Sequence, residues 1–180
     1  MKTKKIVITG GPGTGKSSII NELQKKGYSC LEEISRQVTL QAREEGIEQM
    51  FLTEPLLFSE RLLKGRKAQF YEANTSIQPC VFLDRGVHDV LAYMDFIGDK
   101  YPETFKNVCD SLAYDHIFIL KPWKEIYKSD AVRYENFEQA LQIHECLVNT
   151  YEGFNYTLID VPFDTVENRA DYILNEIKTL

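Results

Sequence analysis

The residues best suited to chemistry lie together near the amino terminus, in a stretch that fits the phosphate-binding pattern G-x-x-x-x-G-K-[ST]. It reads Gly10-Gly11-Pro12-Gly13-Thr14-Gly15-Lys16-Ser17. Glycines allow backbone N–H groups to close around phosphate oxygens, Lys16 can reach the β- and γ-phosphates, and the Ser17 hydroxyl can bind Mg²⁺. We therefore predict a site for a nucleoside triphosphate, ATP or GTP, with Mg²⁺. The expected nucleotide contacts are Gly11, Pro12, Gly13, Thr14, Gly15, Lys16, Ser17 and Ser18.

The flanking segments place this loop between a strand and a helix. Residues 5–9 are mostly apolar and typical of a strand. After the loop, Ile19, Ile20 and Leu23 follow helical spacing, and Gly27 ends the pattern. The positive end of that helix would point at the same phosphates. This context distinguishes a phosphate loop from an ordinary glycine-rich turn.

A second chemical position is Asp84, at the end of the apolar run 80–84. A carboxylate that ends a buried strand can hold Mg²⁺, directly or through water. The next residue, Arg85, cannot act as a base but offers a fork for phosphate or carboxylate. Motor and remodelling ATPases usually carry Glu there to activate water, and the sequence also lacks the N-K-x-D motif of ordinary GTPases. Both observations favour a small-molecule kinase.

Acidic residues also follow the second expected strand. Glu33 could orient or deprotonate an acceptor hydroxyl, and Glu32 is a rival because strand ends are uncertain by one residue. Arg36 lies on the same helical face as Glu33 and is a candidate for substrate binding, as is Arg85. The alternative is a solvated helix start with an ion pair between Glu33 and Arg36.

The segment 121–133 carries a local excess of positive charge. It holds Lys121, Lys124, Lys128 and Arg133 against Glu125 and Asp130. Such a lid could close over the nucleotide and neutralise the phosphoryl group in transfer, with Arg133 as the catalytic candidate. The alternative is a solvated basic loop.

The remaining pattern alternates strands with helices. Further strands are expected at 28–31, 80–84, 116–120 and 156–159. Helices are expected at 34–44, 87–97 and 102–112. Three more helices should begin at caps: one at Thr53 that runs to about residue 73, one at Asn136 and one at Asp164. This order predicts an α/β fold of three layers, with a parallel sheet between helices. Ligands should bind at the carboxyl ends of the strands.

Composition limits the remaining possibilities. The chain has 180 residues, a net charge of −6 and four scattered cysteines. We expect one domain over residues 1–180, buried reduced cysteines, no nucleic-acid partner, no membrane span and a cytoplasmic location. The basic cluster Arg61, Lys64, Arg66 and Lys67 is interpreted as a solvated helix face, and His88 is a secondary candidate for substrate contact because it is near Arg85.

Several motifs in this order resemble the P-loop AAA-like ATPase/kinase domain family that includes the kinase domain of NadR-type ribosylnicotinamide kinases. They are the stretch 8–17, Glu33-Ile-Ser-Arg36, Phe82-Leu-Asp-Arg-Gly86, Asp130-Ala-Val-Arg133-Tyr-Glu and Val161-Pro162. The resemblance implies a nucleoside-kinase-like fold, a five-stranded sheet in the order 2-3-1-4-5, an arginine-bearing lid, and binding of a nucleoside triphosphate with Mg²⁺. It leaves the acceptor open.

We interpret the chain as a Mg²⁺-dependent phosphotransferase acting on a small, hydroxyl-bearing, nucleoside-like metabolite. Lys16 and the loop would hold phosphates, Ser17 and Asp84 the metal, Arg85 and Arg133 the developing charge, and Glu33 the acceptor. The main alternative is a nucleotide-dependent binding switch without an acceptor. A third is a nucleotide-regulated interaction module for a protein or lipid.

Overall fold

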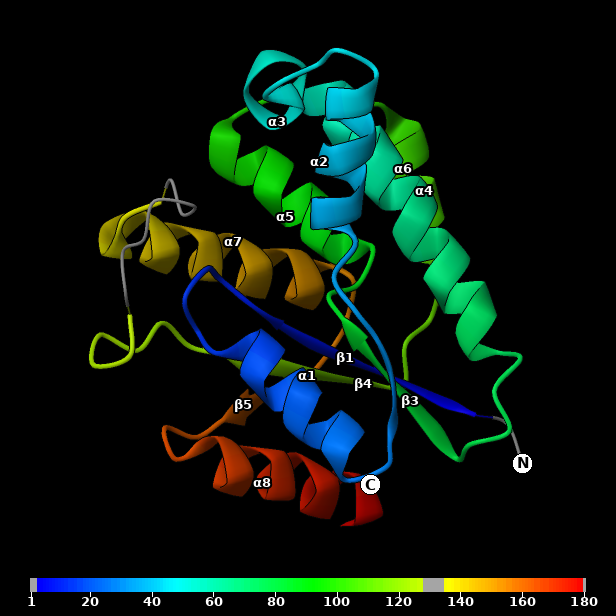
Figure 1. Ribbon diagram of the computed structural model, residues 1–180, viewed down its shortest axis with the longest axis vertical. Helices are drawn as coiled ribbons and strands as arrows, with labels where there is room; N and C mark the ends of the chain where they lie inside the picture. The colour runs from blue at the N-terminus through cyan, green and yellow to red at the C-terminus, as the bar shows by residue number, and fades with distance from the viewer. Residues whose placement is uncertain (1–2, 128–134, 180) are drawn as a thin grey trace.

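The protein is built on a parallel sheet with helices on both faces (Figure 1). The structure is a computed structural model that describes residues 3–127 and 135–179. The strands of this described part are β1 (Lys4–Gly10), β2 (Ser29–Leu31), β3 (Cys80–Asp84), β4 (His116–Leu120) and β5 (Leu158–Val161). They pair in parallel in the order β2-β3-β1-β4-β5. The predicted fold class, and the strand order that the resemblance implied, are confirmed.

Helices bury both faces of the central strands because side chains alternate along each strand. The helices are α1 (Lys16–Lys25), α2 (Ser35–Glu44), α3 (Met50–Thr53), α4 (Pro55–Ala73), α5 (His88–Ile97), α6 (Glu103–Ser111), α7 (Phe137–Gly153) and α8 (Val166–Thr179). From β1, Ile6 and Ile8 join a core with α1 and α8, whereas Val7 joins a core with α4, α5, α6 and α7. The two cores fix the strands and hence the loops at their ends.

The loops that leave the carboxyl ends of the parallel strands lie at one edge of the sheet, although the helices they lead to cover different parts of the molecule. Figure 1 shows α2 and α3 next to α4 and α5 at one end of the molecule, with α1 and α8 at the opposite end. The phosphate loop joins β1 to α1, and the residues after β2 and β3 face the same edge. None of the helices in the described part combines the length and apolarity needed to cross a membrane.

Helix caps show where the sequence patterns were right and wrong. The capping box predicted at Asn136 is confirmed. The Asn136 side chain accepts from Gln139 N at 2.9 Å, and the Gln139 side chain accepts from Asn136 N. Thr53 as a cap is wrong: it ends the short helix α3, where its hydroxyl donates to Gln49 O. The cap expected at Asp164 is wrong by one residue, since the Thr165 hydroxyl accepts from Asn168 N.

Candidate functional site

The phosphate loop connects β1 to α1 through backbone that only glycine adopts without strain. Gly10 has φ +148°, and a Cβ there would lie 2.6 Å from Leu120 O. Gly15, which precedes α1, has φ +90°, and a Cβ there would lie 2.9 Å from the Arg169 guanidinium. The Thr14 hydroxyl donates to Gly11 O at 2.9 Å and closes the turn. The loop is therefore fixed by packing on both sides.

Lys16 folds back over this loop. Its Nζ donates to Gly10 O at 2.7 Å and to Gly11 O at 2.8 Å, and the residue is only 8 % exposed. Burial, helped by the neighbouring Arg85 charge, lowers the pKa of Lys16 to about 7. Two neutral carbonyls are poor partners for a buried ammonium. The anionic oxygens of a polyphosphate would be much better ones.

Asp84 ends β3 beside β1, in register with Ile8. The residue is buried, burial raises the pKa of its carboxyl, and its Oδ1 has no partner among the described residues. Ser17 lies in the first turn of α1 and is exposed. A buried carboxylate oxygen without a partner fits a group kept for a cation.

Mg²⁺ suits this donor set. In the described part of the chain, no three His, Cys, Asp or Glu side chains are grouped as a metal site. A Mg²⁺ ion there would use one carboxylate, the Ser17 hydroxyl, waters and nucleotide phosphates, which is how Mg²⁺ commonly binds at such sites.

Glu33 is held between two arginines. Arg66 Nη2 donates to its Oε1 at 3.0 Å, the Arg85 Nε contacts its Oε2, and Ser35 N donates at 3.2 Å. Burial would raise the pKa of Glu33, but the two guanidinium charges outweigh it and lower the pKa to about 2. The carboxylate is therefore ionised at neutral pH and held in one orientation.

The neighbours of Glu33 decide between the alternatives. Glu32 is exposed and accepts from Gln24 Nε2, so Glu33 is the residue that faces Arg85. Arg36 is exposed, and Glu33 pairs with Arg66 and Arg85 instead of with it. An intrahelical pair of Glu33 and Arg36 is thus not what the structure shows.

Arg66 was placed wrongly from the sequence. It is 3 % exposed and not part of a solvated face; besides Glu33 it contacts Gly86 O at 3.4 Å. Lys64, in the same cluster, is exposed, and Arg61 pairs with Glu45 on the surface. Helical spacing was the signal that could have found Arg66, because it lies four residues from both Leu62 and Phe70 on the buried face of α4.

Asp89 is a second residue that the sequence did not single out. It is fully buried and accepts from Arg85, Gly86, Thr9 and Tyr151. The only signal in the sequence is its position four residues after Arg85, which is a neighbouring position on a helix.

Arg169 and Phe163, which the sequence did not single out, lie on the α8 side of the loop together with Trp123, for which packing or stacking was expected. Arg169 is 2 % exposed, its Nη2 donates to Thr14 O at 3.0 Å, and its Nε is buried without a partner among the described residues. Its guanidinium lies 6.0 Å from the Trp123 ring, which stacks on Phe163 at 5.1 Å and 19°. Phe163 is 52 % exposed. An aromatic pair thus lies beside the phosphate loop.

His88 is not a substrate contact. It is fully buried among the rings of Tyr114, Tyr151, Phe154 and Tyr156, and both ring nitrogens have no partner among the described residues. Burial lowers the pKa of His88 to about 4. The helix α5 begins at His88 and turns this side chain into the core.

The expected lid is described only up to residue 127. Lys121 pairs with Asp160 at 2.7 Å, and Tyr127 packs against Phe137. Lys128 and the catalytic candidate Arg133 lie outside the described residues. The lid and the role of Arg133 stay predictions.

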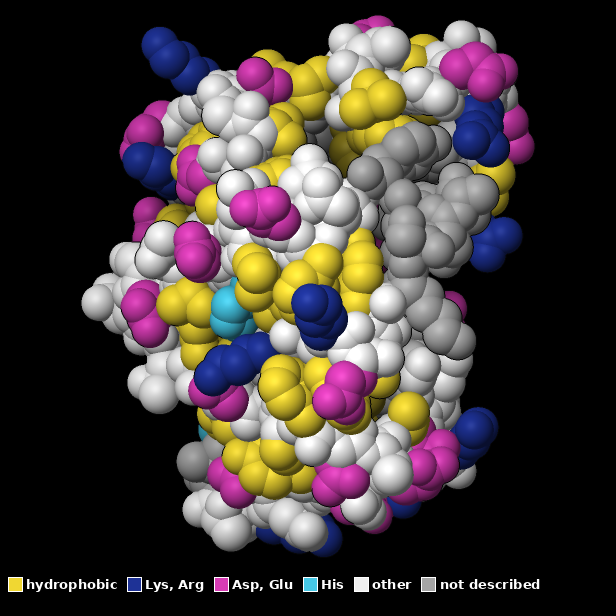
Figure 2. Space-filling view, turned by 90° about the vertical axis from the view of Figure 1, so that its left-hand side faces the viewer, with side chains coloured by type: hydrophobic (Ala, Val, Ile, Leu, Met, Phe, Trp, Pro, Cys, Tyr) yellow, Lys and Arg dark blue, Asp and Glu magenta, His cyan; other side chains and the backbone are white. Residues whose placement is uncertain are grey.

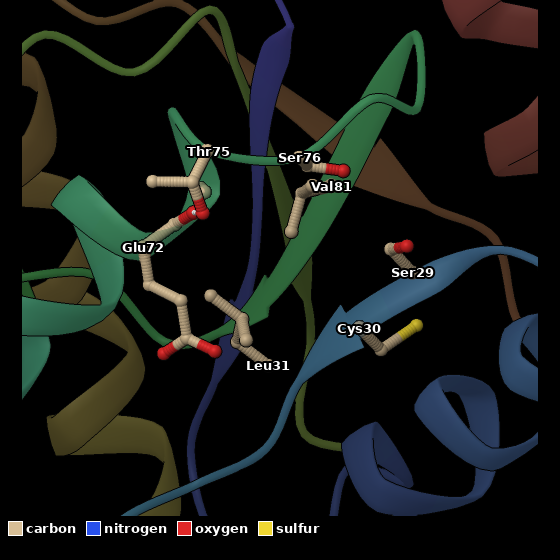
Figure 3. A pocket seen from close by; sticks show the side chains of 8 residues that line it. Ser29, Cys30, Leu31, Glu72, Thr75, Ser76 and Val81 are labelled. Atoms are coloured by element: carbon tan, nitrogen blue, oxygen red, sulfur yellow. Dashed lines mark hydrogen bonds between the residues drawn. The ribbon is translucent and has the colours of Figure 1, made fainter.

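One hollow on the surface lies away from the phosphate loop. Figure 2 shows acidic, basic and hydrophobic side chains interspersed on one face. A hollow of about 290 Å³ lies between β2, β3 and the end of α4, bordered by Ser29, Glu72, Thr75 and Val81 among others (Figure 3). It lies at the beginning of β2 and β3, not at the edge that carries the phosphate loop, so we do not assign it to the site.

Comparisons with known proteins agree with this fold. A family model described as an AAA domain matches residues 5–169. A structure of NadR protein in complex with NR superposes with TM-score 0.78 at 18 % identity, covering 99 % of this chain and 52 % of that one. Deoxyadenosine kinase from M. mycoides, with dCMP and dCDP bound, gives 0.69 at 19 % identity, covering 98 % and 100 %. Comparison with curated protein sequences gives no significant match.

Proposed function

The chain belongs to the AAA domain family, and from that premise we propose that it is a Mg²⁺-dependent phosphotransferase. It would move the γ-phosphoryl group of ATP or GTP to a hydroxyl of a small, nucleoside-like metabolite. The observation that carries the proposal is the pairing of a phosphate loop with an ionised, arginine-held carboxylate at the same edge of the sheet. A binding switch needs the loop but has no use for that carboxylate.

The charges in question act on one another, so they belong to one site. Burial and then the positive charge of Arg85 lower the pKa of Lys16, and the negative charges of Asp84 and Glu33 offset part of this lowering. Arg85 in turn contacts Glu33. Residues that hold phosphate, metal and acceptor are therefore within electrostatic reach of each other.

Each residue then has a defined task in phosphoryl transfer. Lys16 and the loop amides would bind the β- and γ-phosphates, while Ser17 and Asp84 would hold Mg²⁺, which would neutralise charge on the phosphates. Arg85 stabilises charge on the group in transfer, as Arg133 would from the lid. Glu33 receives the acceptor hydroxyl and aims its oxygen at phosphorus.

The low pKa of Glu33 bears on its role. A carboxylate whose pKa is about 2 is a weak base, so orientation of the hydroxyl contributes more than removal of its proton. Phosphoryl transfer through a loose transition state requires little proton removal before the bond to phosphorus forms.

The stacked rings of Trp123 and Phe163 are a candidate binding site for the base of the nucleoside triphosphate. The pair lies beside Arg169, which binds the carbonyl of Thr14 in the phosphate loop. Aromatic rings bind the π-face that every nucleobase offers. Stacking alone does not distinguish adenine from guanine, so we expect ATP and GTP to bind with similar affinity.

The nucleoside-like acceptor is proposed by analogy with two proteins of the same fold. One is a deoxyadenosine kinase, and the other, NadR, was crystallised with NR. This chain spans about half of that NadR chain. The analogy sets the first compounds to test.

The test is a screen for acceptor phosphorylation with labelled ATP and Mg²⁺ over nucleosides and related hydroxyl compounds. For the compound that becomes labelled, Glu33→Gln should keep Mg-nucleotide affinity and lower turnover by about 10²-fold or more. The matched control Glu32→Gln should stay close to wild type. Nucleotide binding without labelling of any acceptor, and equal ATP turnover in wild type and Glu33→Gln, would favour the switch instead.

A further inference from the structure

We propose that Asp89 is a positioning residue that fixes Arg85 relative to the phosphate loop before nucleotide binds. The inference rests on the proposed role of Arg85 in phosphoryl transfer, but the position of the Arg85 side chain can be measured independently of that role.

Each oxygen of the Asp89 carboxylate accepts two hydrogen bonds. Its Oδ1 accepts from the Thr9 hydroxyl at 2.5 Å and from Arg85 Nη1 at 3.3 Å. Its Oδ2 accepts from the Tyr151 hydroxyl at 2.6 Å and from Gly86 N at 3.0 Å. A carboxylate offers about four lone-pair sites, and here four donors fill them. Asp89 has no exposed surface from which it could touch a substrate, whereas the Glu33 side chain is 22 % exposed, which argues for positioning by Asp89 and against catalysis.

The backbone of Arg85 needs such support. Its φ of +76° is unusual for a residue with a side chain, and the strain persists only where the surroundings hold it. Arg85 N donates to Ile8 O at 3.1 Å, and Gly86 N is held by Asp89. Bonds on both sides of the Arg85 α-carbon thus fix its direction.

Burial makes this arrangement sensitive to the charge of Asp89. Asp89 has no exposed surface, and the Arg85 side chain is 11 % exposed. Arg85 also pairs with Glu33, but Glu33 is shared with Arg66. Two guanidinium groups are thus balanced by two carboxylates. Removing the Asp89 charge would leave both arginines to compete for Glu33.

Thr9 connects Asp89 and Arg85 to the phosphate loop. It is the residue before Gly10, at which the phosphate loop begins, and it is fully buried. Asp89 therefore bridges the end of β1 and the guanidinium that faces the acceptor. Such a bridge holds a catalytic group in place without reorganisation during the reaction.

The experiment uses Asp89→Asn, with Tyr151→Phe as the matched control that removes a donor from the same carboxylate and keeps its charge. The readout is solvent exchange of the Arg85 Nη1 protons, which donate to Asp89, measured by NMR at low temperature and assigned through Arg85→Lys. We expect exchange to accelerate about tenfold or more in Asp89→Asn, because a charge-assisted bond is lost, and to change little in Tyr151→Phe. Wild-type exchange at Arg85 in folded Asp89→Asn overturns the proposal.

If Asp89→Asn does not fold, the double variant Asp89→Asn with Arg85→Met still decides whether the proposal holds. If the double variant folds, the carboxylate is needed to match Arg85, as proposed. If it also fails to fold, Asp89 serves the scaffold around Thr9 and Tyr151, and the proposal is wrong.

With an acceptor identified, a kinetic readout follows. Asp89→Asn and Arg85→Lys should lower kcat similarly with the KM for ATP unchanged, and the double variant should lose little more than either alone. Additive losses contradict positioning. Absence of any acceptor refutes the proposed function but leaves the NMR test of Asp89 valid.

Discussion

Nucleotide binding should draw a proton from solvent onto Lys16. In the free protein the buried ammonium contacts only two carbonyls, and its pKa is about 7. Phosphate oxygens would stabilise the charged form and raise this pKa. At pH 7.5 about three quarters of the free protein then has neutral Lys16, so binding should take up about 0.8 proton per site. At pH 6 the uptake should be only about 0.1.

The same linkage weakens binding in alkaline solution. Only the protonated lysine attracts the triphosphate, so affinity should fall as pH rises above 7. Between pH 7 and 9 the protonated fraction of free Lys16 drops about 50-fold, which corresponds to about 2 kcal/mol of binding free energy.

Calorimetry in buffers with different ionisation enthalpies measures this uptake directly. ATP with saturating Mg²⁺ would be titrated in Hepes and in Tris at pH 7.5, and the difference in apparent enthalpy gives the number of protons. Lys16→Arg is the matched control, because arginine stays charged throughout this range. Equal apparent enthalpies for tightly binding wild type in both buffers would refute the reasoning, as would the same uptake in Lys16→Arg.

Three further outcomes are expected. Asp84→Asn should weaken nucleotide binding in Mg²⁺ but not in EDTA; a loss of affinity that ignores Mg²⁺ would mean a structural role. The fluorescence of Trp123, the single tryptophan, should change with ATP and with GTP but much less with tripolyphosphate, and identical spectra would exclude base stacking there. His88 has a folded pKa of about 4, below its ordinary 6.5, so the unfolded chain binds its proton first. The contribution of His88 to the free energy of unfolding should therefore be complete above pH 6.5 and fall by about 3 kcal/mol as pH decreases to 4. Denaturation measured against pH should show that His88→Phe lacks this fall. The same pH dependence in His88→Phe and wild type would contradict the prediction.

Local sequence determined the parts of this protein whose physics is local. The phosphate loop is readable because glycine backbone freedom, a lysine and a hydroxyl must follow one another at fixed spacing. Apolar runs such as 80–84 predicted strands buried on both faces, and the structure places β3 there. The alternation of strands and helices then placed Glu33 and Asp84 after neighbouring strands, at one edge of the sheet.

Tertiary structure decided which charges meet. Arg66 lies 33 residues from Glu33; helical spacing puts it on the apolar face of α4 with Leu62 and Phe70, but only the fold shows which carboxylate it meets there. Arg169 reaches the loop from 155 residues away. Such contacts depend on how helices pack across the sheet, and a periodic pattern states only that a residue lies on some face. For this reason the sequence named the phosphate loop and Glu33, while the side chains that hold them in place became visible only in the fold.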